Sequence, residues 1–219
     1  MKKDKTQNLL KAVICFFVYF VYSMYSLNIG KSLGIKNDVI TMFVSDLLFL
    51  IFIVLMYYKN VKNDIKNLKK VKVSKVIKRI LFWVALIFVL NIVMGAFTEY
   101  VLKVPDGTDS NTEALWNLSK GYMIFKTLIF GVVAEEILFR ESISDVVDNN
   151  ILYIIISSLI YTAMHFVFMD NSEYIFIDLL VYFIPALFFS TAYVRGNRNI
   201  VLLMLIKFAY NLIPVLLFI

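Results

Sequence analysis

Six polar side chains in three apolar segments are the candidates for chemistry in this chain. They are two adjacent carboxylates and an arginine in the first segment, the only histidine of the chain in the second, and a lysine and an amide in the third: Glu135, Glu136, Arg140, His165, Lys207 and Asn211. Charges at bilayer depth are costly and are rarely retained without a function. Together these residues predict an intramembrane active site.

Helical spacing places the two glutamates in different surroundings. Glu136 and Arg140 are four residues apart and share one helix face, where an ion pair would reduce the cost of burying either charge. Glu135 points roughly 100° away and is free to face a cavity. Burial and the adjacent like charge would make Glu135 a stronger base, as general-base catalysis near neutral pH requires.

The remaining candidates can reach the same depth. If the helix of Glu135 continues to about residue 148, Glu135 and His165 each lie ~20 Å from the turn between their helices. Lys207 and Asn211 share one face near the middle of their segment. A structural interpretation stays open for each group: a salt bridge at a helix end, a satisfied core histidine, and a lysine that snorkels or pairs with an internal carboxylate.

The composition places this site in a membrane protein. The 219 residues are 61% hydrophobic with a mean hydropathy of +0.80, which a soluble domain with one core could not bury. Seven apolar runs are each long enough to cross ~30 Å of hydrocarbon, the fourth being interrupted by Lys126: 9–28, 39–58, 80–101, 122–139, 151–169, 174–194 and 200–219. Strand alternation is not evident, so we predict an all-α fold, a polytopic transmembrane helix bundle of about seven spans.

The basic residues predict how the chain is oriented. The net charge is +6, and lysines are concentrated in the connection 59–79, which the positive-inside rule assigns to the cytoplasm. Alternation of sides then places the amino terminus, the link after Arg140 and the connection at 195–199 inside, and the connections 103–120 and 170–173 outside. We interpret the basic connection as a topology determinant on anionic lipid headgroups, with a nucleic-acid patch as the alternative.

The same connection divides the chain. We expect residues 1–79 to form two transmembrane helices and a basic cytoplasmic connection, and residues 80–219 to form a helical core that carries the chemistry. Asp46 is the one charge well inside the first two apolar runs. It is either part of a proton or ion pathway or a packed acid, neutral or paired with a lysine.

Three short motifs resemble those of a known family. The segment EEILFR at 135–140 resembles the EExxFR motif of the CPBP family of intramembrane proteases, which includes type II CAAX prenyl endopeptidases and bacteriocin-processing or immunity proteins. The family's aromatic residue four positions before a histidine resembles Tyr161 and His165, with Tyr where Phe is usual. Its HxxxN motif aligns with Lys207 and Asn211, so a lysine stands in the position of the second histidine. The resemblance extends from about Lys120 to the end.

The resemblance implies roles for these residues and a CAAX-protease-like core. Glu135 would be the general base, Glu136 and Arg140 its support, His165 the group that positions the water, and Asn211 an oxyanion donor. Lys207 could donate to the developing oxyanion or hold Glu135 in a static ion pair.

We therefore expect an intramembrane endopeptidase that cleaves a small membrane-associated or secreted peptide in the cell membrane. The alternatives are a catalytically silent immunity or scaffold protein and a small transporter that uses Asp46 and the glutamates as a proton relay. Zinc needs about three protein ligands, so one histidine and a lysine in the other ligand position argue against a metal. We expect no cofactor, and as partners we expect a peptide or small membrane protein and lipids, not nucleic acid.

Overall fold

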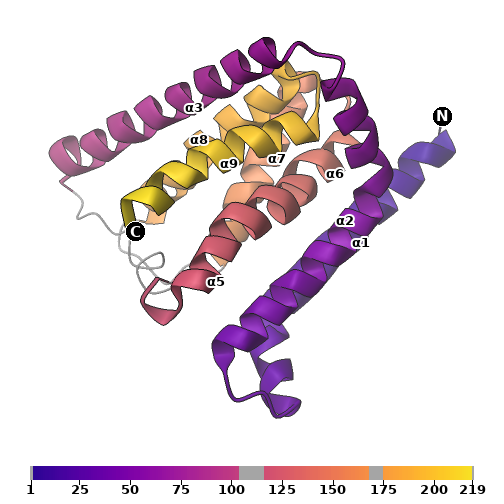
Figure 1. Ribbon diagram of the computed structural model, residues 1–219, viewed down its shortest axis with the longest axis vertical. Helices are drawn as coiled ribbons and strands as arrows, with labels where there is room; N and C mark the ends of the chain where they lie inside the picture. Colours follow the sequence, from indigo (N-terminus) through magenta and orange to yellow (C-terminus); the bar gives the residue numbers. More distant parts are fainter. Residues whose placement is uncertain (1, 104–115, 168–174, 219) are drawn as a thin grey trace.

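The computed structural model describes residues 2–103, 116–167 and 175–218 (Figure 1). These residues form helices and connections without a strand, so the predicted all-α class is confirmed. Residues 104–115 of the predicted outer connection 103–120, and the whole predicted outer connection 170–173, lie outside the described residues.

Six helices in the described residues are long and apolar enough to cross a membrane. Such helices make the chain a multi-pass membrane protein, because only a bilayer tolerates this much exposed apolar surface. Their bounds are α1 (Lys2–Ser32), α2 (Asp38–Leu68), α3 (Val73–Ala96, continued by the π-helical η1, Phe97–Val101), α7 (Asn150–Val167), α8 (Ile175–Arg195) and α9 (Ile200–Phe218).

The segment expected as the fourth span is helical from residue 120 to residue 144, but it is not among the six helices apolar enough to cross a membrane. The described residues therefore contain six such helices where about seven spans were expected. The segment consists of four short pieces: α5 (Lys120–Phe125), η2 (Lys126–Glu135), η3 (Ile137–Glu141) and α6 (Ser142–Ser144). Both η pieces are π-helical, with hydrogen bonds to the fifth residue instead of the fourth. Its charged residues lower its hydropathy, and three of them, Glu136, Arg140 and Glu141, are buried among the helices. We call residues 120–144 the glutamate segment; it ends at Ser144, short of the expected residue 148.

Polar side chains fix where several helices begin. The Asn37 side chain accepts a hydrogen bond from Ile40 N at 3.1 Å, and Ser119 Oγ accepts one from Tyr122 N at 3.3 Å. Asn199 Oδ1 likewise accepts one from Leu202 N at 2.9 Å, at the start of α9. Each satisfies an amide that the first turn of a helix leaves without a backbone partner.

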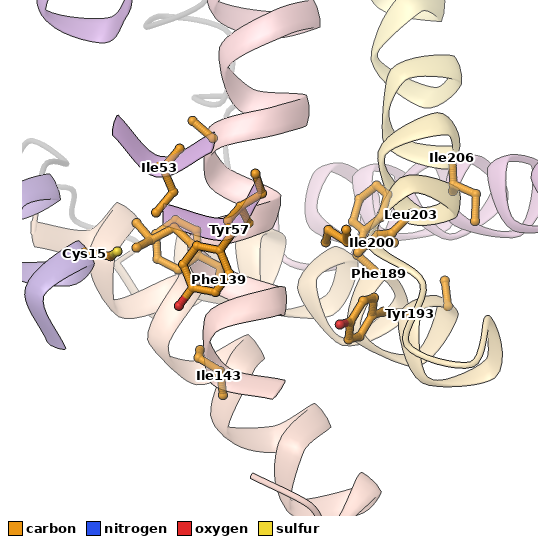
Figure 2. Packing of buried hydrophobic residues seen from close by; sticks show 14 of the residues in the cluster. Cys15, Ile53, Tyr57, Phe139, Ile143, Phe189, Tyr193, Ile200, Leu203 and Ile206 are labelled. Atoms are coloured by element: carbon orange, nitrogen blue, oxygen red, sulfur yellow. The ribbon is translucent and has the colours of Figure 1, made fainter. Parts of the chain in front are cut away.

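The glutamate segment lies between two groups of helices (Figure 1). The hairpin of α1 and α2 packs against one side of it through α2, and α9 packs against another, while α3 lies across α8 and α9 and α7 pairs with α8. Figure 2 shows two groups of core side chains: Cys15, Ile53, Tyr57, Phe139 and Ile143 near the hairpin, and Phe189, Tyr193, Ile200, Leu203 and Ile206 from α8 and α9.

One end of the bundle is held by polar contacts between segments far apart in the sequence. Asn60 Nδ2 on α2 donates to Glu141 Oε1 at 2.6 Å, and Asp64 Oδ2 accepts from Ile200 N at 2.7 Å. Arg198 donates to the carbonyl oxygen of Asp148 at 2.8 Å. This end therefore gathers the carboxyl end of α2, the link after Arg140 and the connection between α8 and α9.

Lys5 adds the amino-terminal part of α1 to the same end through an ion pair with Asp148. These are the segments that alternation of sides assigns to one face of the membrane. Which face is cytoplasmic stays a prediction.

Candidate active site

Glu136 is fully buried between two cations. Its Oε1 accepts a hydrogen bond from Lys207 Nζ at 2.6 Å, and its Oε2 lies 3.7 Å from Arg140 Nε. The predicted pairing of Glu136 with Arg140 is thus present, and the Glu136 carboxylate is the internal partner that the position of Lys207 requires. A buried carboxylate with both oxygens facing cations is held in one geometry.

Arg140 extends this pairing into α7. Its Nη1 donates to Ser157 Oγ at 3.2 Å, and Ser157 Oγ donates to the carbonyl oxygen of Phe139 at 2.7 Å. The hydroxyl of Tyr153 donates to the carbonyl oxygen of Arg140 at 3.3 Å. The arginine therefore fixes both Glu136 and the contact of the glutamate segment with α7.

Glu135 is held less tightly than its neighbour. Its Oε2 lies 3.5 Å from Lys207 Nζ, and its side chain keeps 14% exposure where that of Glu136 has none. The positive charge of Lys207 favours the ionised form of Glu135. It therefore opposes the gain in basicity that we expected for Glu135 from burial. The α-helical angle between the two glutamates does not apply either, since the segment is π-helical on both sides of Glu136.

His165 has one ring nitrogen engaged and one available. Its Nδ1 lies 2.9 Å from the carbonyl oxygen of Tyr161. A carbonyl oxygen only accepts, so Nδ1 carries the proton of this bond and Nε2 of the neutral ring is an acceptor. The charges of His165 and Glu135 lie close enough to interact, as the equal-depth prediction requires.

The ring of Tyr161 links the three helices. It lies 4.2 Å from the ring of His165 between centroids, with Arg140 Cζ 5.0 Å and Lys207 Nζ 5.2 Å from its centroid. The ring of Phe139 packs edge-on against it at 5.2 Å. One aromatic ring thus contacts residues from the glutamate segment, α7 and α9, and brings the histidine beside the charged cluster.

Asn211 lies on α9, on the same face as Lys207 and one turn further along. Its Nδ2 donates to the carbonyl oxygen of Thr127 at 2.9 Å. One amide hydrogen of Asn211 therefore holds the glutamate segment, and the second is left for another acceptor.

The family comparison agrees with this geometry. Residues 117–213 match the model of the Rce1-like family, described as type II CAAX prenyl endopeptidase Rce1-like. Over these residues the chain is similar to the Rce1-like family. No curated protein and no solved structure matches the chain.

The Rce1-like match covers the glutamate segment and most of α7 to α9, where all six candidate residues lie. The four charged members of the set, Glu135, Glu136, Arg140 and Lys207, form a cluster with two negative and two positive charges. A neutral side chain in place of Lys207 would leave this cluster with a net negative charge. Lys207 therefore balances the charge of this cluster.

Two contributors were not among the predicted site residues. Tyr161 was identified only as the aromatic position of the second motif, although a tyrosine four residues before the only histidine must share its helix face. Tyr182 on α8 also packs against the His165 ring, 5.1 Å between centroids. No signal in the sequence points to Tyr182, because its contact depends on how α8 is rotated against α7.

Asp46 is resolved as a packed, lysine-paired acid. Both of its carboxylate oxygens accept hydrogen bonds from Lys126 Nζ, at 3.0 and 2.9 Å. This is one of the two interpretations that its sequence position allowed, and the pairing joins α2 to the first residue of η2.

Proposed function

We propose that the chain is an intramembrane endopeptidase in which Glu135 and His165 activate water to hydrolyse a peptide bond. The observation that carries the proposal is the meeting of Glu135, His165 and Lys207 from three helices around Tyr161, in a region that matches the Rce1-like family. A charged cluster with this composition inside an apolar bundle is costly, and an active site is a reason to retain it.

The water would be activated by Glu135 and His165, because each keeps an atom that can accept a hydrogen from it. Glu135 takes one proton of the water while His165 Nε2 accepts a hydrogen bond from the other and orients the attack. The oxygen of the water bonds to the scissile carbonyl carbon, and the carbonyl becomes an oxyanion. Glu135 then returns its proton to the amide nitrogen as the carbon–nitrogen bond breaks, leaving a carboxylic acid and an amine.

Two donors from α9 are available for the oxyanion. Lys207 Nζ carries three hydrogens and uses two of them on the glutamates, and Asn211 keeps one amide hydrogen beyond its bond to Thr127. A fixed donor in a site of low dielectric stabilises a developing oxyanion more than water does. Glu136 and Arg140 would hold Lys207 and Glu135 in place without touching the substrate.

We further propose that hydrolysis needs no metal. The described residues bring together no group of three His, Cys, Asp or Glu side chains able to hold an ion, and a lysine occupies the position of the family's second histidine. Catalysis would then persist in the presence of a strong chelator, whereas a zinc-dependent site would lose its activity.

The location and partners follow from the same proposal. The enzyme would lie in the cell membrane with its amino terminus in the cytoplasm, and its substrate would be a peptide or a small membrane protein that reaches the site from the bilayer or its surface. The basic connection 59–79 would rest on anionic lipids, with no role in nucleic-acid binding.

The test is cleavage of candidate membrane-associated peptides by purified protein in lipid vesicles. Glu135→Gln keeps the shape of the side chain and removes the base, so cleavage should fall by a factor of 100 or more, on the order of the general-base contribution. Glu99→Gln, on an exposed glutamate of η1, is the matched control and should leave cleavage unchanged. Equal cleavage by wild type and Glu135→Gln would reject the assignment and leave the silent immunity or scaffold protein.

A further inference from the structure

The ion pair between Asp46 and Lys126 has no part in the proposed chemistry. Yet the carboxylate of Asp46 accepts more hydrogen bonds than any other described carboxylate of the hairpin. Asp46 is 3% exposed, and each of its oxygens accepts two hydrogen bonds. Besides Lys126, its donors are the hydroxyl of Tyr122 at 2.9 Å and that of Tyr22 at 3.1 Å. Helices α1 and α2 and the glutamate segment therefore converge on one carboxylate.

This carboxylate holds one end of the π-helical piece whose other end carries the proposed base. Lys126 is the first residue of η2 and Glu135 is the last. A π-helical stretch of this length is uncommon, and such stretches are found mostly at functional sites. Contacts from outside must therefore maintain η2, and Asp46 supplies one while Asn211 supplies another through the carbonyl oxygen of Thr127.

Aromatic packing strengthens the attachment of the hairpin to η2. Lys126 Nζ lies 3.9 Å from the centroid of Phe130, on the following turn. Phe130 in turn contacts Tyr22 and Phe49, at 6.3 and 6.1 Å between centroids, and those two rings stack on each other at 4.9 Å. Lys126 thus lies between the carboxylate of Asp46 and the ring of Phe130, and the hairpin contacts that ring as well.

Gly131 shows how a shift at Lys126 would reach Glu135. A β-carbon built on Gly131 would lie 3.2 Å from the carbonyl oxygen of Lys126 and 3.6 Å from Glu135 Oε2. The turn of Lys126 and the carboxylate of Glu135 therefore border the same small space. Lys126 and Glu135 also lie close enough for their charges to interact.

We propose that Asp46 is a positioning residue for Glu135, acting through Lys126 and η2. The proposal rests on the proposed function, and it extends the working enzyme beyond residues 117–213 to the hairpin of α1 and α2. Asp46 holds Lys126 in a fixed place and also neutralises its charge, so that the proposed base is neither displaced nor exposed to an unpaired cation.

The experiment compares wild type with Asp46→Asn, Lys126→Gln and the double variant, in vesicles. Asp148→Asn is the matched control, since it also removes a lysine-paired aspartate but one whose side chain is 74% exposed. The first readout is hydrogen exchange of the amides of residues 126–135. Asp46→Asn should speed exchange there by about tenfold or more, which corresponds to ~1.4 kcal/mol of local stability, while α8 and the control stay at the wild-type rate.

The second readout is peptide cleavage against pH. Asp46→Asn should lower kcat by roughly tenfold to a hundredfold, the range that small displacements of catalytic groups produce, with KM nearly unchanged. It should also move the acidic limb of kcat/KM to lower pH, because an unpaired Lys126 favours ionised Glu135. In the Lys126→Gln background the same substitution should have a much smaller effect, since the two residues act as one pair.

The outcomes separate this proposal from the proposed function. Faster exchange of residues 126–135 in Asp46→Asn, with no cleavage by any protein including wild type, supports the positioning role and removes the protease. Unchanged exchange overturns the positioning role, whether or not the wild type cleaves. A uniform loss of folded protein, with a normal pH profile in the remainder, also overturns it, because that is the signature of a merely structural ion pair.

Discussion

At the scale of single residues, Lys207 decides the character of the site. It lies 2.6 Å from Glu136 and 3.5 Å from Glu135, so its shorter contact is with the carboxylate that Arg140 also faces. A direct contact of Lys207 with Glu135 alone would have suited a static ion pair. The longer distance instead leaves Glu135 as the less constrained member of the cluster.

Removing Lys207 should expose the cost of two adjacent buried carboxylates. We expect Lys207→Met to destabilise the folded protein by on the order of 3–5 kcal/mol, because breaking a buried ion pair leaves an uncompensated charge. Adding Glu136→Gln should recover much of this loss, because only Glu135 then remains to be neutralised and Arg140 is available. Thermal unfolding in detergent measures both variants.

The control for this prediction is an ion pair at the surface. Lys5→Met removes the exposed pair with Asp148 and should change stability by about 1 kcal/mol or less. A Lys207→Met protein as stable as Lys5→Met would mean that Glu136 does not depend on the lysine.

At the scale of elements, the π-helical glutamate segment explains why parts of the site could be predicted and others could not. The pairing of Glu136 with Arg140 followed from four-residue spacing, which is a local property of one helix. The pairings of Lys207 with Glu136 and of Asp46 with Lys126 depend on how whole helices are rotated against each other. Sequence periodicity fixes which face of a helix is polar, but it does not fix which polar residue that face will meet.

Gly131 tests whether the π-helical piece tolerates an ordinary side chain. The added methyl group of Gly131→Ala would press on the backbone oxygen of Lys126, so the helix must shift beside Glu135. We expect cleavage to fall about tenfold, less than the hundredfold that a full 1 Å displacement can cause. Steady-state cleavage of the same peptide measures the effect.

Gly95 provides the comparison, because a β-carbon there meets nothing within 4 Å on α3. Gly95→Ala should leave cleavage unchanged and stabilise α3 by up to ~1 kcal/mol through helix propensity. If the two alanine variants cleave equally well, the space beside Gly131 has no role in placing Glu135.

Glu141, near the end of the glutamate segment, predicts a dependence of stability on pH. Burial raises the pKa of Glu141 to about 7, against the hydrogen bonds from Tyr193 and Asn60 that favour its charged form. An unfolded glutamate titrates near ~4.3. Between these two values the folded chain keeps a proton that the unfolded chain releases, so stability should fall as the pH rises through this range.

Glu141→Gln should flatten this dependence between pH 5 and pH 7, because the amide keeps the shape of the group without titrating. Melting temperatures at several pH values in one detergent provide the measurement, with Glu99→Gln as a control that should retain the wild-type slope. An unchanged slope in Glu141→Gln would assign the pH dependence to other groups. Asp145 would then be the next residue to substitute, since burial raises its pKa as well.

At the scale of the whole molecule, hydropathy predicted the class and most of the spans, because long apolar helices are set by the bilayer and not by their neighbours. Hydropathy is lower at 120–144, where Lys126, Glu135 and Glu136 are paired with residues of other helices. The segment whose hydropathy is least like that of a span is therefore the one that carries the site. Its path could not be predicted from apolar length alone.

The proposed division at residue 79 can be tested by splitting the chain. Residues 80–219 alone would leave Lys126 without Asp46, and Glu141 without Asn60. We expect this fragment to be poorly folded and inactive, since each lost partner leaves a buried charge or acceptor unsatisfied. Residues 1–79 expressed as a separate chain should restore folding and cleavage, because the break falls in the first turns of α3, where the side chains are mostly exposed, and the buried contacts can form again between the fragments. With Asp46→Asn in the added fragment, folding should still recover while cleavage stays roughly tenfold to a hundredfold lower. A fragment 80–219 that cleaves normally without residues 1–79 would show that the hairpin is only an anchor.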